Sequence, residues 1–490
     1  MDEDDRRFLR VHLILLPYVA SYLGHYWLRL PPLRSGMALL LCYPAVAGIC
    51  AWLGWRARLA TKLALWFAFS LLPLALTVAS GYVAYRSLPV AVPAPESVRK
   101  TVSPLFVHLS DPHFLIPARR TSTEGRVIDT RQAARMVALV IALRPRFLII
   151  SGDVTDAGAE EEWRHAVESL LFPVLSVGVK TIMAPGNHDM QPALLLNRGE
   201  LPTQDQHWAS IVIEAQVAAR FLRNLSLHGP GFRNSAGLNL EGLLRAWDGN
   251  TFDFKLPAEE YQRCIQRTAG AALGGGHALG SQAMIADTLC KIQLNRDIMD
   301  FIGTYRSWFP LIHHDPSTGT TVVVLNSNDE MEEAIGSNAV GTLGVSQLER
   351  LREAFTTLPE PTQQCLIVMH HMPVRRVGDS FQLPRKLSFE SLSASQAFQY
   401  SAMSTRLRDV RRLVQELEAV ALRRPNLQLL LLCGHFHRRW LGQLSTRITI
   451  AEAGPPLETG GVWVGAWDAA VGRVALRWHP TIPSDIAGPP

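Results

Sequence analysis

The 490-residue sequence predicts an α/β fold, preceded by an apolar N-terminal segment. Short runs of Val, Leu, Ile and Phe, typical of buried strands, alternate with helix-like segments over residues 105–190. Such alternation favours strands joined by right-handed helical crossovers. Five apolar runs also end in Asp, Asn or His, and ligands of open α/β folds gather at the carboxyl ends of strands. The functional residues are therefore expected at the ends of the strands.

The length exceeds that of one typical domain, so we expect several units. Composition favours a membrane segment over residues 1–87, followed by a Pro-rich extended linker over 88–104. A large α/β domain is expected over 105–480. A mostly helical insertion at about 200–315 interrupts it, either as a cap beside a pocket or as a peripheral decoration.

The N-terminal segment has three runs without Asp, Glu, Lys or Arg, at residues 11–28, 36–55 and 63–85. About 20 apolar residues in a helix span a bilayer. We therefore expect two to three transmembrane helices, a multi-pass protein of the cell membrane and the lipid bilayer as a partner. A buried pair of core helices is the alternative. Six positive residues on one side of a three-helix topology and five on the other lean towards a non-cytoplasmic large domain.

The basic charge belongs to the N-terminal segment. Residues 1–100 hold 11 Lys and Arg against 5 Asp and Glu, and the remainder holds 37 against 38. We therefore expect no nucleic-acid binding by the large domain. The six cysteines form no CxxC pattern, and Cys365 and Cys433 are expected to be buried thiols in strands.

Helices and strands of the large domain follow from local patterns. Asp129 and Gln132 resemble a capping box that opens a helix ending near Leu143, and a second helix is expected through Glu160–Leu171. After the insertion, strands are expected to resume at Thr320–Asn326.

The remaining elements are expected towards the C-terminus. A helix there begins with the capping-box residues Ser346 and Glu349. An amphipathic helix is expected over Thr405–Leu422, and a closing hairpin over Gly461–Trp478.

The strand ends carry residues of the kinds that bind metal ions. Borderline and hard cations are bound by carboxylate, amide oxygen and imidazole. A carboxylate shared by two ions can hold them ~3.5–4 Å apart, and Asp153 is the candidate for that bridge. Taken singly, each histidine would more often be a core or surface residue. The candidates, in chain order, are Asp111, His113, Asp153, Asn187, His370, His435 and His437.

These motifs together resemble the calcineurin-like metallophosphoesterase superfamily. The chain shows Asp-x-His, Gly-Asp-x-x-Asp, Gly-Asn-His-Asp, His-His-x-Pro and Gly-His-x-His in that order over residues 111–437. The resemblance implies a four-layer α/β/β/α sandwich, here preceded by the transmembrane segment. It also implies two divalent or trivalent metal ions, for which Mn, Fe and Zn all suit the ligands.

The resemblance also implies a role for each motif residue. Asp111, His113, Asp153 and His437 would hold one ion, and Asp153, Asn187, His370 and His435 the other. His371 is an alternative ligand to His370. His188 matches the histidine that assists the leaving oxygen, and Asp156 matches the carboxylate that orients it. His108 is expected to be a core strand residue.

The implied activity is hydrolysis of a phosphodiester or phosphomonoester by a hydroxide bridging the two ions. The substrate could be a small molecule, a nucleotide or a lipid. Ala157 and Asp189 stand where protein phosphatases of the superfamily carry Arg and Glu, which disfavours a protein phosphatase and favours a phosphodiesterase-like branch. The alternative function is a catalytically silent membrane receptor or scaffold, although the complete ligand set disfavours it.

Overall fold

The computed structural model describes residues 86, 88–96, 104–115, 130–190, 206–242, 296–328, 341–360, 362–377, 409–468 and 473–480. All of them except residue 86 belong to one compact unit, formed by Leu88–Asp379 and Thr405–Pro490. The description below concerns that unit.

A five-stranded sheet contains the first three predicted strand ends. Its order is β13-β12-β2-β3-β4. Strands β2 (Phe106–Leu109), β3 (Phe147–Ile150) and β4 (Lys180–Met183) are parallel. The hairpin of β12 (Gly461–Asp468) and β13 (Arg473–Pro480) completes the sheet, with β12 antiparallel to β2. The expected C-terminal hairpin is therefore confirmed.

An eight-stranded sheet contains the other two strand ends, in the order β5-β6-β7-β9-β11-β10-β1-β8. Its parallel centre is formed by four strands, β6 (Thr320–Val324), β7 (Gln364–Val368), β9 (Gln428–Cys433) and β11 (Ile448–Glu452). The outer strands are β5 (Leu311–Asp315), β10 (Trp440–Ser445), β1 (Val90–Pro93) and β8 (Arg375–Arg376). Cys365 on β7 and Cys433 on β9 are buried free thiols, as expected.

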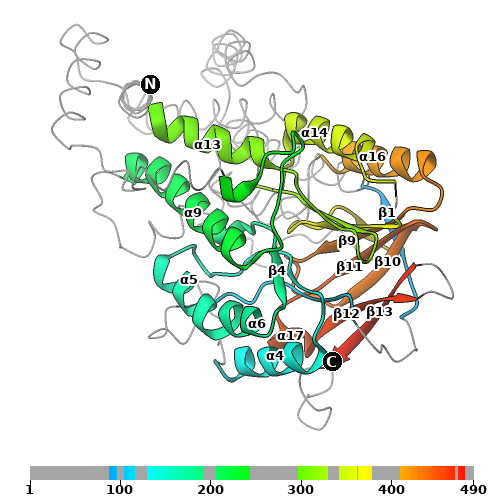
Figure 1. The fold of residues 1–490 in the computed structure, drawn as a ribbon, viewed down its shortest axis with the longest axis horizontal. Coiled ribbons are helices and arrows are strands. Elements are labelled where there is room, and N and C mark those ends of the chain that lie inside the picture. Colours follow the sequence, from blue (N-terminus) through cyan, green and yellow to red (C-terminus); the bar gives the residue numbers. More distant parts are fainter. Residues whose placement is uncertain are drawn as a thin grey trace, which may run out of the picture. The chain divides into compact units, whose positions relative to one another are not determined.

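Helices lie outside both sheets (Figure 1). On the side of the eight-stranded sheet are α14 (Gly344–Thr356) and α16 (Val410–Arg423), and α16 packs on β9 and β11. On the side of the five-stranded sheet are α4 (Thr130–Leu143), α5 (Glu160–Ala166), the π-helical turn η1 (Val167–Leu171) and α6 (Phe172–Ser176). The chain therefore has the expected mixed α/β fold with two sheets.

The start of α14 differs from the expected capping box. The helix begins at Gly344, so Ser346 lies inside its first turn. The orphan N–H groups are instead capped by a side chain distant in sequence, because Asp409 Oδ2 accepts hydrogen bonds from the Leu343 and Gly344 amides, both at 3.0 Å. Asp409 immediately precedes α16, so one carboxylate ties together the starts of both helices on this sheet.

Parts of the predicted linker and insertion are built into the core. Residues 90–93 of the expected linker form β1, which pairs with β10 and β8, and Ala91 is buried. Helix α9 (Gln206–His228) packs on β4 and on α13 (Arg296–Trp308). Strand β5 begins at Leu311, inside the expected insertion and before the strand expected at Thr320. The middle of that segment, residues 243–295, lies outside the described residues.

The expectation of a multi-pass membrane protein is wrong, because it is contradicted by the helices that the structure describes. Within the described residues, no helix is both long and apolar enough to cross a membrane. The longest of them, α9, has 23 residues but includes Arg220 and Arg223. The three charge-free runs on which the expectation rested lie outside the described residues.

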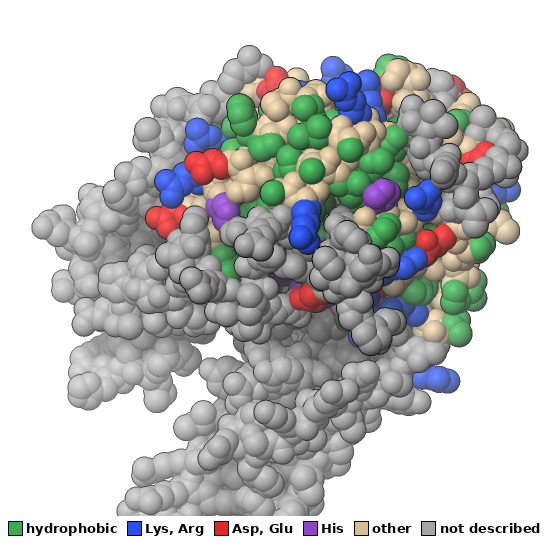
Figure 2. Space-filling model, turned by 90° about the horizontal axis from the view of Figure 1, so that it is seen from below, with side chains coloured by type: hydrophobic (Ala, Val, Ile, Leu, Met, Phe, Trp, Pro, Cys, Tyr) green, Lys and Arg blue, Asp and Glu red, His purple; other side chains and the backbone are tan. Residues whose placement is uncertain are grey.

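The core of the unit is apolar and its surface is mixed. Phe106 on β2 is 0% exposed, and its ring lies against Gly465 of the neighbouring strand β12, where a Cβ would collide with it. Figure 2 shows one face of the molecule, on which hydrophobic side chains alternate with uncharged and charged ones. Phe172, at the start of α6, is 62% exposed. Phe106 and Phe172 thus differ in burial and not in chemistry.

We expect Phe106→Ala to lower the free energy of unfolding by about 3–5 kcal/mol, because it leaves a cavity between β2 and β12. Phe172→Ala, the matched control, should change it by less than about 0.5 kcal/mol. Urea denaturation of both variants measures the difference. Equal effects of the two substitutions would contradict the packing described here.

Candidate metal centre

The five predicted motifs meet where the two sheets come together. The Asp111 and Asp153 segments continue the pairing of β2 and β3 past the strand ends, because the Asp111 amide donates to the Gly152 carbonyl at 3.1 Å and the His113 amide donates to that of Asp153 at 3.0 Å. In the other sheet, the Gly434 amide donates to the His370 carbonyl at 2.9 Å. The backbone thus fixes each motif against its neighbour before any side chain contributes.

The backbone conformation at the site is unusual. Six described non-glycine residues have a positive φ, and Arg144 is the one outside the motifs. Left-handed conformations cost energy for side chains other than glycine, and such strain concentrates at functional sites. The left-handed turns direct consecutive side chains into one space. The five motif residues concerned are Asp111, His113, Asp153, His435 and His437.

Two glycines of the motifs permit close approach. A Cβ on Gly152 would lie 2.5 Å from Nδ1 of His370, and one on Gly186 would collide with the backbone nitrogen and Oδ1 of Asp153. The glycines that precede Asp153 and Asn187 are therefore required because another motif packs directly against their backbone.

The first group of side chains contains Asp111, His113 and His437. Their potential ligand atoms all lie within 4.8 Å of one another. Nε2 of His437 is 3.2 Å from Asp111 Oδ1 and 3.4 Å from Nε2 of His113. A carboxylate oxygen and two imidazole nitrogens therefore converge.

The second group contains Asp153, His370 and His435, whose ligand atoms also lie within 4.8 Å of one another. Asn187 joins them through Oδ1, which is 2.8 Å from His370 Nε2 and 3.0 Å from His435 Nδ1. Those two ring nitrogens are themselves 3.1 Å apart. A carboxylate, an amide oxygen and two imidazoles thus face one point.

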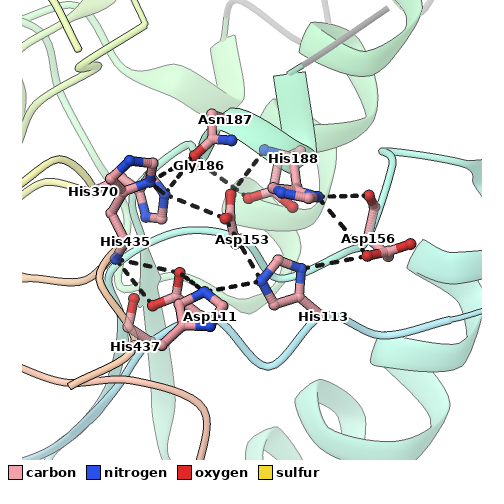
Figure 3. Close-up of polar contacts among 12 residues, drawn as sticks. Asp111, His113, Asp153, Asp156, Gly186, Asn187, His188, His370, His435 and His437 are labelled. Atoms are coloured by element: carbon pink, nitrogen blue, oxygen red, sulfur yellow. Dashed lines mark hydrogen bonds and ion pairs between the residues drawn. The ribbon is translucent and has the colours of Figure 1, made fainter. Parts of the chain in front are cut away.

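Asp153 lies between the two groups (Figure 3). Its Oδ2 is 3.3 Å from Nε2 of His370 and 3.7 Å from Nε2 of His113. Its Oδ1 accepts the His188 backbone N–H at 2.8 Å. One oxygen is therefore anchored to the backbone, and the other is directed between the groups.

His188 and Asp156 lie on the far side of His113. Nδ1 of His188 lies 2.9 Å from the backbone carbonyl oxygen of Asp156 and must donate the hydrogen bond, because a carbonyl oxygen can only accept. The same nitrogen is 3.8 Å from the Asp156 carboxylate. The same carboxylate lies 3.6 Å from His113 Nδ1. His188 therefore carries its proton on Nδ1, which leaves Nε2 available.

His371 and His108 lie outside both groups. Nδ1 of His371 is 2.8 Å from Ser327 Oγ, and its ring packs against His435 with centroids 4.5 Å apart. His108 is buried on β2, where its Nε2 lies 2.9 Å from Ser151 Oγ. Of the adjacent pair, it is therefore His370 that enters the second group.

Burial and charge act against each other throughout the site. Burial raises the pKa of Asp153, but His370, His188 and His113 outweigh it and hold the pKa well below its usual range. Burial lowers the pKa of His370, but Asp153 outweighs it and raises this pKa to about 9. Burial, assisted by His370, lowers the pKa of His435 to about 3, because adjacent imidazoles cannot both be charged. The Asp153 carboxylate thus stays ionised and favours positive charge beside it.

Asp189 is an anchor that the sequence did not reveal. Its carboxylate accepts hydrogen bonds from the Thr155 amide at 2.8 Å, the Val154 amide at 3.2 Å and the Gly186 amide at 3.1 Å. It thereby ties the segment after Asp153 to the segment before Asn187. Its place after Asn-His can be read from the sequence, but its hydrogen-bond partners depend on the contact between two loops that are distant in the chain.

The donor set fits metal ions. In each group two imidazole nitrogens lie 3.1–3.4 Å apart, and one of them lies 3.2–3.3 Å from a carboxylate oxygen, so several lone pairs are directed at one point. Carboxylate, amide oxygen and imidazole are ligands of Mn, Fe and Zn. The described residues can therefore hold metal, with Asp153 reachable from either group.

The chain matches several solved structures at low sequence identity. A dimetal phosphatase from Danio rerio is 11% identical, with a TM-score of 0.35, over 78% of this chain and 98% of that one. A 5'-nucleotidase from Candida albicans is 10% identical, with a TM-score of 0.34, over 79% of this chain and 54% of that one. A purple acid phosphatase from yellow lupin (Lupinus luteus) seeds is 10% identical, with a TM-score of 0.32, over 79% and 53%.

The amino-acid sequence of the chain matches a known protein family. No curated protein matches the chain. Residues 104–439, more than half of the chain and all five motifs, match the family described as calcineurin-like phosphoesterase. This chain belongs to the calcineurin-like phosphoesterase family.

Proposed function

We propose that the chain is a dinuclear metal-dependent phosphoesterase. The observation that carries the proposal is the position of Asp153, whose Oδ2 lies 3.3 Å from a nitrogen of one ligand group and 3.7 Å from a nitrogen of the other. A single ion would need only one of the two groups. A shared carboxylate between two complete groups favours a two-ion centre.

The two groups divide the ligands in the proposal. Asp111, His113 and His437 would hold one ion, and Asn187, His370 and His435 the other, with Asp153 shared. Bound ions would supply Lewis acidity towards phosphoryl oxygens and activation of water. The position of these seven residues just beyond strand ends supports this division.

His188 is proposed as the proton donor to the leaving oxygen. Its Nδ1 is fixed by the Asp156 carbonyl at 2.9 Å, so Nε2 is the nitrogen that can exchange a proton. The Asp156 carboxylate, 3.8 Å from Nδ1, favours the protonated ring electrostatically. Asp156 acts here as the orienting group and His188 as the group that reaches substrate.

The proposed substrate is a small phosphoester, such as a nucleotide. The buried site presents groups that can bind cations, and bound cations would neutralise the negative charge of a phosphoryl group. A phosphomonoester and a phosphodiester are alternative substrates for the same site, and hydrolysis of one model compound of each class distinguishes them.

The full chain should hydrolyse p-nitrophenyl phosphate or bis(p-nitrophenyl) phosphate in the presence of added Mn²⁺, and EDTA should abolish the release of nitrophenol. The preferred compound identifies the ester class. Metal binding without turnover of either compound or of nucleotides would favour the alternative of a silent binding domain.

Asp153→Asn should remove metal content and turnover together, because it withdraws the negative charge shared by both groups. Metal analysis by mass spectrometry and the hydrolysis assay measure the two effects. Asp468→Asn is the matched control, because register places Asp468 at the opposite end of β12 from the site. Full metal loading of Asp153→Asn would exclude the bridging role.

His188→Ala should keep the metal content and lower kcat by about 10²–10⁴-fold, the usual contribution of a general acid. The split between metal content and kcat separates this role from that of a ligand. Unchanged kcat with either ester would refute the assignment.

A further inference from the structure

Each histidine ligand needs a second contact that fixes its ring. Metal-binding histidines generally donate their other ring N–H to a carboxylate, a carbonyl or water. In the second group, His370 Nδ1 donates to the Ser151 carbonyl at 2.9 Å. In the first group, His113 Nδ1 faces the buried Asp156 carboxylate at 3.6 Å. These supports are buried and lie within the motifs.

His437 is supported differently. Its Nε2 faces Asp111, and its Nδ1 lies 3.4 Å from Oε2 of Glu458. Glu458 lies on α17 (Pro456–Thr459), the short turn between β11 and β12. It is outside residues 104–439, the part of the chain that matches the family.

The segment that carries Glu458 is itself held at the site. A Cβ on Gly454 would lie 2.5 Å from the carbonyl carbon of His437, so the backbones touch. The Glu458 and Thr459 amides both donate to the Pro455 carbonyl at 3.0 Å, which fixes the turn. The backbone of this turn is therefore held beside His437, with Glu458 Oε2 3.4 Å from its Nδ1.

We propose that Glu458 is a positioning residue for His437, and that it sets the affinity for the ion of the Asp111, His113 and His437 group. Its carboxylate accepts the Nδ1 proton, which fixes the tautomer with Nε2 free to bind metal. The Glu458 side chain is 37% exposed, whereas His370 of the other group is held by the backbone carbonyl of Ser151, a fully buried residue. The ion of this group is consequently the more exchangeable of the two. The inference rests on the proposed metal centre.

The test measures Mn²⁺ binding to the full chain by equilibrium dialysis with metal analysis, for Glu458→Ala and Glu458→Gln. Glu353→Ala, an exposed glutamate on α14, is the matched control. In Glu458→Ala we expect one of two Mn²⁺ ions to bind about 10–100-fold more weakly. The other ion should be unaffected. Glu458→Gln, which keeps an acceptor oxygen, should be intermediate.

Activity supplies the second readout. In Glu458→Ala the Mn²⁺ concentration for half-maximal hydrolysis should rise, and kcat at saturating Mn²⁺ should return to the wild-type value. Equal weakening of both ions, affinity like that of Glu353→Ala, or a lower kcat at saturation without a change in affinity would each overturn the inference.

The same data separate this inference from the proposed function. Wild-type protein that binds two Mn²⁺ ions without hydrolysing either ester would overturn the function, while the affinity of Glu458→Ala would still decide the role of Glu458. Wild-type protein that binds no Mn²⁺ would overturn both.

Discussion

The carboxylate of Asp153 is the group on which the rest of the site depends. It is buried, yet it stays ionised because three histidines surround it. A buried charge without compensation would be expensive, so the fold must bring positive or metal-binding partners to it from both sheets. His370 comes from the end of β7 and His113 from the end of β2. The meeting of the sheets is therefore tied to the chemistry of one carboxylate.

The backbone contributes strain to this arrangement. Left-handed conformations of non-glycine residues cost of order 1–3 kcal/mol each when they lie in sparsely populated regions. The hydrogen bonds that extend the β2–β3 pairing, and the carboxylate of Asp189 across two loops, hold the turns in place. These turns are organised before any ligand arrives, because they are held by backbone hydrogen bonds and by a buried carboxylate.

The supports of the histidines are unequal. His370 is fixed by the backbone carbonyl of Ser151, a buried residue directly after β3, whereas His437 is fixed by the side chain of Glu458 on a surface turn. A side-chain carboxylate at the surface can exchange its partner for water, and a buried backbone carbonyl cannot. The two halves of the centre thus share a bridging group but differ in how firmly their ligands are held.

The sequence by itself determined the parallel strands, the polar residues at their ends and the side chains that could form two ligand groups. It could do so because strand period and residue chemistry are local: Phe147–Ile150 reads as a buried strand whatever surrounds it. The sequence also favoured membrane helices at the N-terminus, in runs that lie outside the described residues, and no described helix is long and apolar enough to cross a membrane.

The tertiary structure alone determined the features that depend on contacts between segments far apart in the sequence. It built residues 90–93 into a sheet and capped α14 with Asp409. It also directed Glu458 at His437, although the family match ends at residue 439. Hydrogen-bond partners far apart in the chain leave no local pattern, because their pairing is fixed by how the sheets pack and not by spacing.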